Sequence, residues 1–167
     1  MFMQHFPPPP NRVIPKLYDL GLGPLIGRFI LLLTTTGRKS GLPRTTPLQY
    51  EKIDGAYYVG SARGVQADWF RNLVANPQVE VRVKSQRFCG QAEAVTAPDR
   101  IADFLELRLR RHPRIVGMIL KRDGLPARPT RADLEAYAQK LAMVIIRMTE
   151  AGPSESSANH DQPQAGK

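Results

Sequence analysis

The sequence has very little thiol or imidazole chemistry. Cys89 is the only cysteine, so no disulfide can form within the chain, and a reducing, cytoplasmic location is expected. We interpret Cys89 as a small core or strand residue rather than a nucleophile. His5 and His160 lie in the terminal segments, and His112 lies in a basic run. No spacing of His, Cys and carboxylates resembles a metal site, and no Gly-x-Ser-x-Gly elbow occurs, so neither a metal centre nor a serine hydrolase is predicted.

Long apolar runs are also missing. Leu17–Leu33 is apolar but is interrupted by Asp19, Arg28, a proline and three glycines. A helix that spans a membrane needs about 20 largely uninterrupted apolar residues. The stretch therefore predicts a short helix or turn followed by a strand, and peripheral membrane contact through Leu17–Leu33 stays open as an alternative. Met1–Asn11 lacks the basic start and apolar centre of a signal peptide.

Acidic residues are outnumbered, with 15 Asp and Glu against 24 Lys and Arg, and the net charge is +9. This balance points to an anionic partner such as a nucleic acid, a membrane surface or a polyanionic small molecule. No helix-turn-helix or aromatic-interleaved RNA motif is present, so a nucleic acid is not expected. The length and the apolar content of 42% suit one globular domain. We place it at 13–150, between a flexible segment at 1–12 and a disordered tail at 151–167.

No acidic residue occurs between Asp19 and Glu51, and this interval holds the most informative motif of the chain, Thr34–Pro47. The motif combines glycines with three cations and several hydroxyls. Its cations are Arg38, Lys39 and Arg44, and its hydroxyls include Ser40. Glycine allows close backbone approach to a ligand, and Arg and Lys donate to phosphate or carboxylate oxygens. With no acid nearby to pair the cations, the motif predicts an anion-binding turn between two strands. The alternative is an ordinary solvated basic hairpin.

Apolar periodicity and turn residues predict an α+β domain around an antiparallel sheet. Strands are predicted at Phe29–Thr35, Arg44–Ile53, Ala56–Ser61, Val79–Val83, Arg87–Thr96 and Met143–Met148. Helices are predicted at Asp68–Ala75, at Pro98–Arg111 and after a capping box at Thr130 and Asp133, with Pro113 ending or kinking the second of them. Asp54-Gly55 predicts a two-residue hairpin turn, and one of Tyr57 and Tyr58 is expected to face inward.

A second small basic loop, Gly60–Gly64, precedes the helix at Asp68–Ala75. In that helix Trp69 and Leu73 are predicted to share one face, and Phe70 and Val74 the neighbouring one. Trp69, the only tryptophan, suits either a hydrophobic anchor or a contact to a planar ring. No credible acid–base pair occurs, so catalysis would depend on a cofactor that the protein binds through its cations and an apolar slot.

Two segments resemble the deazaflavin-dependent nitroreductase family. Leu33–Leu48 carries the basic turn, and Asp68–Val81 reads Asp-Trp-Phe-Arg-Asn-Leu-Val-Ala-Asn-Pro-Gln-Val-Glu-Val. Two motifs in the right order and spacing are far more specific than either alone. The resemblance is strong over Leu33–Val83 and weaker as far as Thr149.

This resemblance implies an antiparallel split β-barrel with short helices, like the FMN-binding, pyridoxamine phosphate oxidase-like barrels. It also implies coenzyme F-420, an 8-hydroxy-5-deazaflavin with a phosphate and a polyglutamate tail, in preference to FMN. The family pattern would place phosphate and carboxylate contacts at Arg38, Lys39, Ser40 and Arg44, and the ring slot at Pro47, Leu48, Gln49 and Trp69. Gln49 departs from the tyrosine common there. The family's Ser-Lys-Gly-Gly loop reads Ser61-Ala62-Arg63-Gly64 here, so Arg63 replaces the lysine or Ser61 keeps the serine role.

The implied activity is hydride transfer from the reduced cofactor to an electron-poor small molecule, such as a quinone, an enone or a nitroaromatic. The protein would bind and orient two planar partners without a catalytic side chain of its own. Split barrels of this kind are often dimers, and the sequence leaves a homodimer open. The alternative is a non-catalytic protein that binds a lipid or another anionic ligand in the same basic site.

Overall fold

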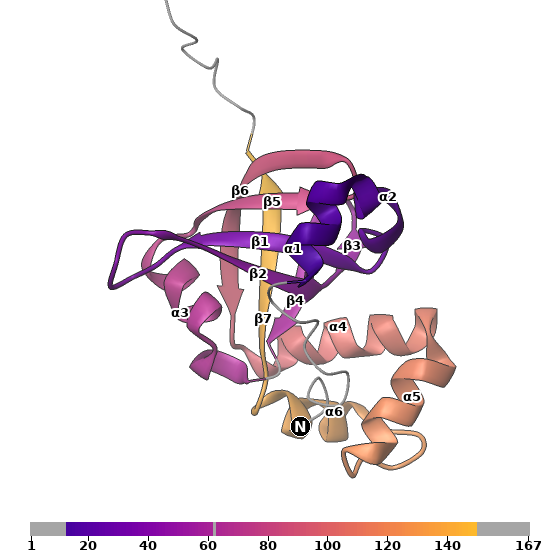
Figure 1. Ribbon diagram of the computed structural model, residues 1–167. Helices are drawn as coiled ribbons and strands as arrows, with labels where there is room; N and C mark the ends of the chain where they lie inside the picture. The colour runs from indigo at the N-terminus through magenta and orange to yellow at the C-terminus, as the bar shows by residue number, and fades with distance from the viewer. Residues whose placement is uncertain (1–12, 62, 150–167) are drawn as a thin grey trace, which may run out of the picture.

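The computed structural model describes residues 13–61 and 63–149, and within them seven strands form one antiparallel sheet (Figure 1). The strands are β1 (Ile30–Thr36), β2 (Pro43–Gln49), β3 (Glu51–Ile53), β4 (Ala56–Ser61), β5 (Gln78–Val83), β6 (Gln86–Val95) and β7 (Ala142–Met148). The helices are α1 (Val13–Leu17), η1 (Tyr18–Leu22), α2 (Gly23–Ile26), η2 (Gly64–Gln66), α3 (Asp68–Ala75), α4 (Pro98–Arg111), α5 (Pro113–Arg122) and α6 (Arg131–Ala138). The expectations for 1–12 and 151–167, for Ala62 and for His5 and His160 concern residues outside this description.

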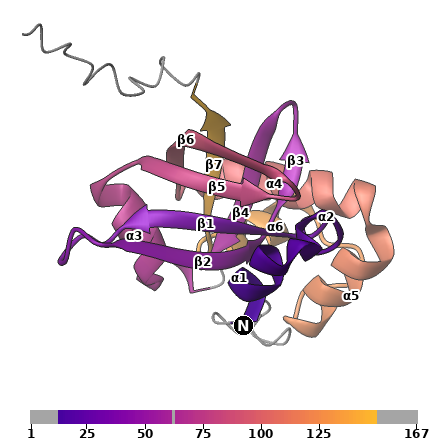
Figure 2. The same cartoon turned by 45° about the horizontal axis from the view of Figure 1, so that its top comes forward.

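The sheet, in the order β2-β1-β5-β6-β7-β4-β3, curls so that β1, β2 and β5 cross the direction of β7 (Figures 1 and 2). Its two ends approach each other where the rings of Tyr50 and Tyr57 lie 5.5 Å apart. Side chains from β1, β4, β5, β6 and β7 fill the enclosed space, and α3 covers it with Phe70 and Leu73. The predicted α+β split barrel is thereby confirmed.

Strand β7 separates two hydrophobic cores. Val144 and Ile146 point into the barrel, whereas Met143 and Ile145 point to the opposite face, which α4, α5 and α6 cover. Successive side chains of a strand alternate between faces, so a strand buried on both sides has a continuous apolar sequence. The run Ala142–Ile146 is buried throughout for this reason.

The helical layer follows the predicted pattern at two of its three helices. Helix α4 has the predicted bounds, and α6 begins with the predicted capping box of Thr130 and Asp133. The third helix, α5, was not predicted as a separate element. Pro113 occupies its first turn, where the missing N–H of proline costs no hydrogen bond, so the residue starts a helix as well as ending one.

The N-terminal segment packs on the outside of the barrel, as short helices followed by a strand, which confirms the expectation for Leu17–Leu33. Tyr18 donates to the Ile30 carbonyl at 2.6 Å, and Arg82 donates to Asp19 at 2.6 Å. At Gly27 a Cβ atom would lie 2.2 Å from the Lys84 backbone nitrogen, so only glycine allows this contact. Among the described residues, no helix has the length and apolar character needed to cross a membrane.

Side-chain orientation agrees with most predictions. The Asp54-Gly55 turn is confirmed, with positive φ at both residues. Tyr57 faces the barrel core and Tyr58 the helical layer, where its ring stacks on Phe104.

Two sequence expectations about side chains need correction. In α3 the inward residues are Phe70 and Leu73, and Val74 is exposed, because the helix covers the barrel with only one narrow face. Cys89 lies in β6, as expected of a strand residue, but it is exposed on the outer face of the sheet rather than in the core.

Candidate functional site

The basic turn between β1 and β2 is a compact hydrogen-bonded loop. The Gly37 N–H donates to the Leu42 carbonyl at 2.8 Å, and the Gly41 N–H donates to the Gly37 carbonyl at 2.7 Å. Gly41 has a φ of 67°, which favours glycine there. Ser40 accepts from the Leu42 N–H through its hydroxyl. The loop therefore has a defined shape, and the side chains of Lys39 and Arg44 extend from it into solvent.

Arg38 differs from its neighbours because its side chain is bound to α3. Its guanidinium donates to the Asp68 carboxylate at 2.9 Å, to the Asp68 carbonyl at 3.4 Å and to Asn72 Oδ1 at 3.1 Å. The sequence expectation that no acid pairs the cations of this turn is wrong for Arg38. Its partner comes from the second motif, 30 positions later.

Asn72 is a part of the site that sequence reasoning missed. The side chain is buried in α3, accepts from the backbone N–H of Arg38 at 3.2 Å and donates to Thr35 Oγ1 at 3.2 Å. Thr35 in turn donates to the Arg44 carbonyl at 3.4 Å. One amide thus connects both stems of the basic loop to the helix. A buried polar residue must find hydrogen-bond partners, so an asparagine next to inward-facing Phe70 and Leu73 was the available signal.

The second basic loop meets the first around Asp68. The Arg38 guanidinium, by its hydrogen bond and its charge, holds the pKa of the Asp68 carboxyl below its usual value, and Arg71 and Arg63 lower it further. Three cations around one carboxylate leave this corner positively charged. The predicted residues Arg38 and Arg63, from different loops, therefore lie in one electrostatic environment.

The remaining residues of the second loop have different positions. The Ser61 side chain is buried, and its hydroxyl donates to the Gly64 carbonyl at 2.7 Å, which closes the loop. Arg63 is exposed. Arg63 is therefore accessible to a ligand, whereas the Ser61 hydroxyl is engaged in a hydrogen bond within the loop.

The residues expected at the ring slot divide between two faces of β2. Leu48 pairs in register with Leu31 and packs against the barrel core, as Trp69 does. Pro47 and Gln49 pair with Leu32 and Ile30, which face the N-terminal segment. Trp69 is half-buried, edge-on to Phe70 at 6.0 Å between ring centroids. Leu48 and Trp69 thus border the same core, whereas Pro47 and Gln49 lie on the other face of β2.

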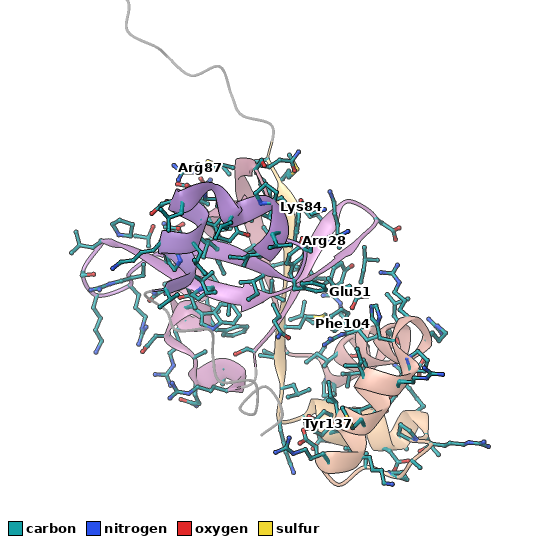
Figure 3. The ribbon with its side chains drawn as sticks, turned by 45° about the vertical axis from the view of Figure 1, so that its right-hand side comes forward. Arg28, Glu51, Lys84, Arg87, Phe104 and Tyr137 are labelled. Atoms are coloured by element: carbon teal, nitrogen blue, oxygen red, sulfur yellow. The ribbon has the colours of Figure 1, made fainter. Side chains whose placement is uncertain are left out.

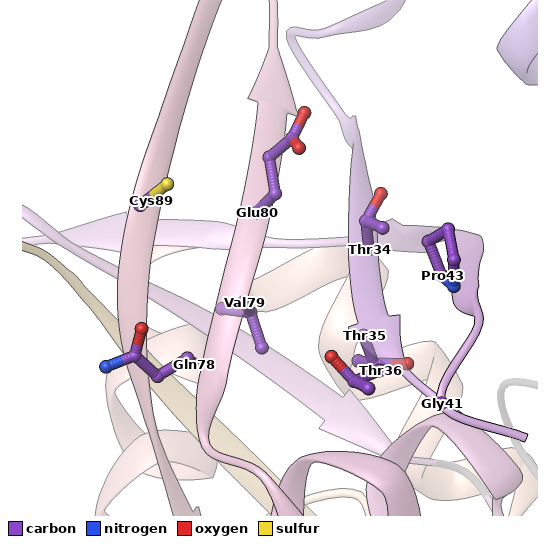
Figure 4. A pocket seen from close by; sticks show the side chains of 9 residues that line it. All are labelled: Thr34, Thr35, Thr36, Gly41, Pro43, Gln78, Val79, Glu80 and Cys89. Carbon is purple, nitrogen blue, oxygen red and sulfur yellow. The ribbon is translucent and has the colours of Figure 1, made fainter. Parts of the chain in front are cut away.

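A shallow cavity of about 250 Å³ lies on the outer face of the sheet, next to the basic loop (Figure 4). Its walls come from β1, the start of β2, β5 and β6. They include Thr34, Thr36, Glu80 and Cys89. The threonines of the Thr34–Pro47 motif, with Gly41 and Pro43, reach this cavity, but none of the residues predicted to contact a ligand lines it.

The arrangement suits anion binding more than acid–base catalysis. Lys39, Arg44 and Arg63 are exposed cations on two loops that converge at Asp68. Residues 13–61 and 63–149 contain no group of three or more His, Cys, Asp or Glu side chains placed to hold a metal ion. Exposed guanidinium and ammonium groups on a defined loop fit a flexible polyanion, because each can pair with a phosphate or carboxylate.

Comparison with known proteins gives a family match. The sequence profile of the family described as F420H(2)-dependent quinone reductase matches residues 21–116, more than half of the 167 residues. An F420H(2)-dependent quinone reductase of Mycobacterium tuberculosis is 42% identical over 72 residues, which span 41% of this chain and 48% of the relative. The chain thus spans about half the length of the curated relatives it matches.

Solved structures support the fold. The match to HutZ, a haem storage protein from Vibrio cholerae, spans 84% of this chain and 92% of the HutZ chain, with a TM-score of 0.51 and 18% identity. The match to a pyridoxamine 5′-phosphate oxidase-like protein from Listeria innocua spans 80% of this chain and 94% of the Listeria chain, with a TM-score of 0.50 and 13% identity. At such identities the likeness concerns the split barrel alone.

Proposed function

Because this chain belongs to the F420H(2)-dependent quinone reductase family, we propose that it binds coenzyme F-420 and reduces a quinone. The observation that carries the proposal is the basic loop. Asn72 holds it in one shape by accepting from the Arg38 N–H and donating to Thr35, while Lys39 and Arg44 remain exposed. A loop fixed before binding loses little conformational freedom when an anionic ligand arrives.

The residues present fit the cofactor's chemistry. Lys39, Arg44 and Arg63 would pair with its phosphate and glutamate carboxylates, while Leu48 and Trp69 would contact its planar ring. Arg38 would contribute its positive charge while it stays bound to Asp68. Ser40, Pro47, Gln49, Ser61 and Ala62 remain proposed contacts through their side chains or backbone. The reduced cofactor supplies the hydride when bound, and the protein orients it against the acceptor and limits access of water.

The acceptor class extends beyond quinones in this proposal. An electron-poor enone or nitroaromatic is also a planar acceptor, and it too would have to stack close to the hydride donor. The described residues near the loops include no buried acid suited to protonate a product, so we infer that water supplies the proton. Acceptor range would then follow the shape of the slot beside Trp69 rather than a specific acid.

Two further properties belong to the same proposal. We infer a cytoplasmic location from the single cysteine, and a homodimer from the split-barrel fold. Peripheral membrane contact through Leu17–Leu33 is supported by the exposure of Leu20, Leu25 and Phe29 on the N-terminal segment. Light scattering after gel filtration tests the dimer, and vesicle sedimentation tests the membrane contact.

Stopped-flow absorbance tests the activity. Reduced coenzyme F-420 mixed with the protein and a quinone should be oxidised faster than without protein, and NADPH alone should not replace it. Cofactor titration should change the fluorescence of Trp69, the only tryptophan. If the cofactor binds but no quinone, enone or nitroaromatic speeds its oxidation, the protein is a binding protein. If a fatty acid binds and the cofactor does not, the site belongs to a lipid or another anion.

A further inference from the structure

A second cavity, of about 200 Å³, opens between α4 and the face of the sheet that the helical layer covers. Its lining combines side chains from β3, β4 and β7 with side chains from α4. Ile145 of β7 lines it, whereas the next residue, Ile146, belongs to the barrel core. The cavity therefore lies on the opposite side of the sheet from the barrel. None of the described residues that we propose as cofactor contacts lines it.

The inner part of this cavity is apolar. It is formed by Ile53, Met143 and Ile145, which are buried, and by two aromatic rings. Phe104 of α4 stacks on Tyr58 of β4, with 5.5 Å between the ring centroids and 19° between the planes. Figure 3 shows Phe104 where α4 meets the sheet. An apolar cavity of about 150 Å³ in another protein holds benzene, so this one has room for a six-membered ring and a small substituent. The aromatic lining favours an aromatic ring.

The polar groups of the lining lie at the opening. Arg100 and Asp103 are there, with side chains that are 44% and 68% exposed. Arg100 donates to Glu93 at 2.5 Å through Nη1, and this bond uses one of the five N–H donors of a guanidinium. The Asp103 carboxylate pairs with Arg131 at 2.5 Å, which offsets its charge. Tyr58 also lines the cavity, and its hydroxyl can donate. The opening therefore favours a ligand group that accepts hydrogen bonds and carries negative charge.

We propose that this cavity is a second ligand site, which binds an aromatic carboxylate with a single ring. The ring would enter the apolar part beside Phe104, and the carboxylate would stay at the opening, where Arg100 can donate to it. A charge-assisted hydrogen bond is stronger than a neutral one, and burial of the ring adds a hydrophobic contribution. Such a ligand needs no cofactor, so the site does not depend on the proposed reductase activity.

Isothermal titration of the full chain with benzoate tests the site, and one benzoate should bind per chain. Benzylamine has the same ring with the opposite charge, and acetate has the carboxylate without the ring. Each should bind at least about tenfold more weakly, since each lacks one of the two contacts. In protein with isotope-labelled isoleucine methyl groups, benzoate should shift the NMR signals of Ile53 and Ile145. The signal of Ile146 should stay in place, because this residue faces the barrel.

Two arginines pair with Glu93, and only one of them lines the cavity. Arg100→Gln should lower the affinity for benzoate at least about tenfold, because a hydrogen bond between charged groups is lost. Arg147→Gln is the matched control, since it removes the other partner of Glu93 and the same charge, and it should have little effect. Asp103→Asn should raise the affinity, because it removes a negative charge from the opening.

Several results would overturn the proposal. Benzoate might not bind, benzylamine might bind more tightly, or the signal of Ile146 might shift in place of those of Ile53 and Ile145. An equal loss of affinity in Arg100→Gln and Arg147→Gln would also overturn it, since affinity would then follow net charge and not the cavity. Asp103→Asn changes a largely exposed side chain, so the fold should persist, and an affinity that does not rise would contradict the assigned charge of the ligand.

Discussion

Arg38 and Asp68 form a 2.9 Å ion pair that joins the basic loop to the first turn of α3. The pair brings together two sequence motifs that the chain separates by 30 positions. If Arg38 contacts an anionic ligand, as proposed, Asp68 would compete with that ligand for the guanidinium group. Substitutions at this corner of the barrel should therefore change the affinity for an anionic ligand.

Asp68→Asn should tighten cofactor binding. The substitution removes the negative charge that faces Arg38, Arg63 and Arg71, while Asn72 still accepts hydrogen bonds from Arg38. Affinity should be higher at low salt and should fall more steeply as salt is added, because one more cation is available to the ligand. Isothermal titration at two salt concentrations measures both quantities. Weaker binding would mean that Asp68 orients Arg38 for the ligand instead of competing with it.

Lys39→Ala with Arg44→Ala should weaken cofactor binding by about 1.5–3 kcal/mol for each charge-assisted hydrogen bond to the ligand that the substitution removes. Both side chains are exposed, so the free energy of unfolding should hardly change. Arg110→Ala with Arg128→Ala is the matched control, since it removes the same charge from two exposed arginines that belong to neither basic loop. An equal decrease in affinity in the two double variants would assign the effect to net charge and remove these residues from the site.

Asn72→Ala should lower the free energy of unfolding by about 1–3 kcal/mol, because the Arg38 N–H then loses its acceptor and the Thr35 hydroxyl loses the amide that donates to it. Cofactor affinity should fall as well, since the loop is then no longer fixed. Asn76→Ala is the control, as its hydrogen bonds to Thr36 and Gln78 lie nearer the surface. Urea unfolding of both variants measures the difference. An equal decrease in the free energy of unfolding would show that the buried hydrogen bonds of Asn72 contribute no more than those of Asn76.

Stability should decrease in acid through Glu93. This carboxylate on β6 accepts from Arg147 at 2.8 Å and from Arg100 at 2.5 Å, and these hydrogen bonds lower its pKa below the ordinary value for a glutamate. A carboxyl with a depressed pKa stabilises the fold above its ordinary pKa, and this contribution is lost as the pH falls through the lower, folded-state value.

The effect should be small, because the Glu93 side chain is 37% exposed and water screens both pairs. Urea midpoints at neutral pH and across the acid range measure it. Glu93→Gln should be less stable than the original chain near neutral pH and should approach it in acid. A constant difference between the two proteins at every pH would exclude this ionisation as the cause.

Local features of the chain could be predicted from sequence because their signals are local. Asp68–Ala75 and Pro98–Arg111 have the predicted bounds, and the Asp54-Gly55 turn and the Thr130–Asp133 capping box occur as expected. Each depends on residues within a few positions of one another. The family resemblance then indicated the split barrel, which local patterns alone left as an antiparallel sheet.

The missed features depend on contacts across the fold. Neither the charge pattern nor the periodicity of the basic turn indicates that Arg38 pairs with Asp68, since the nearest acids in sequence are Asp19 and Glu51. Val74 is exposed because the barrel end accommodates one face of α3 only. The start of α5 at Pro113 was missed because proline signals a helix end and a helix start with the same residue.

The position of β7 between two cores affects how the protein unfolds. Val144 and Met143 are neighbours in one strand, yet they belong to the barrel and to the helical layer. Loosening either core removes half of the packing around that strand, so the two should melt as a single cooperative unit. The fluorescence of Trp69, which reports on the barrel, and the circular dichroism of the three peripheral helices should therefore follow one thermal transition.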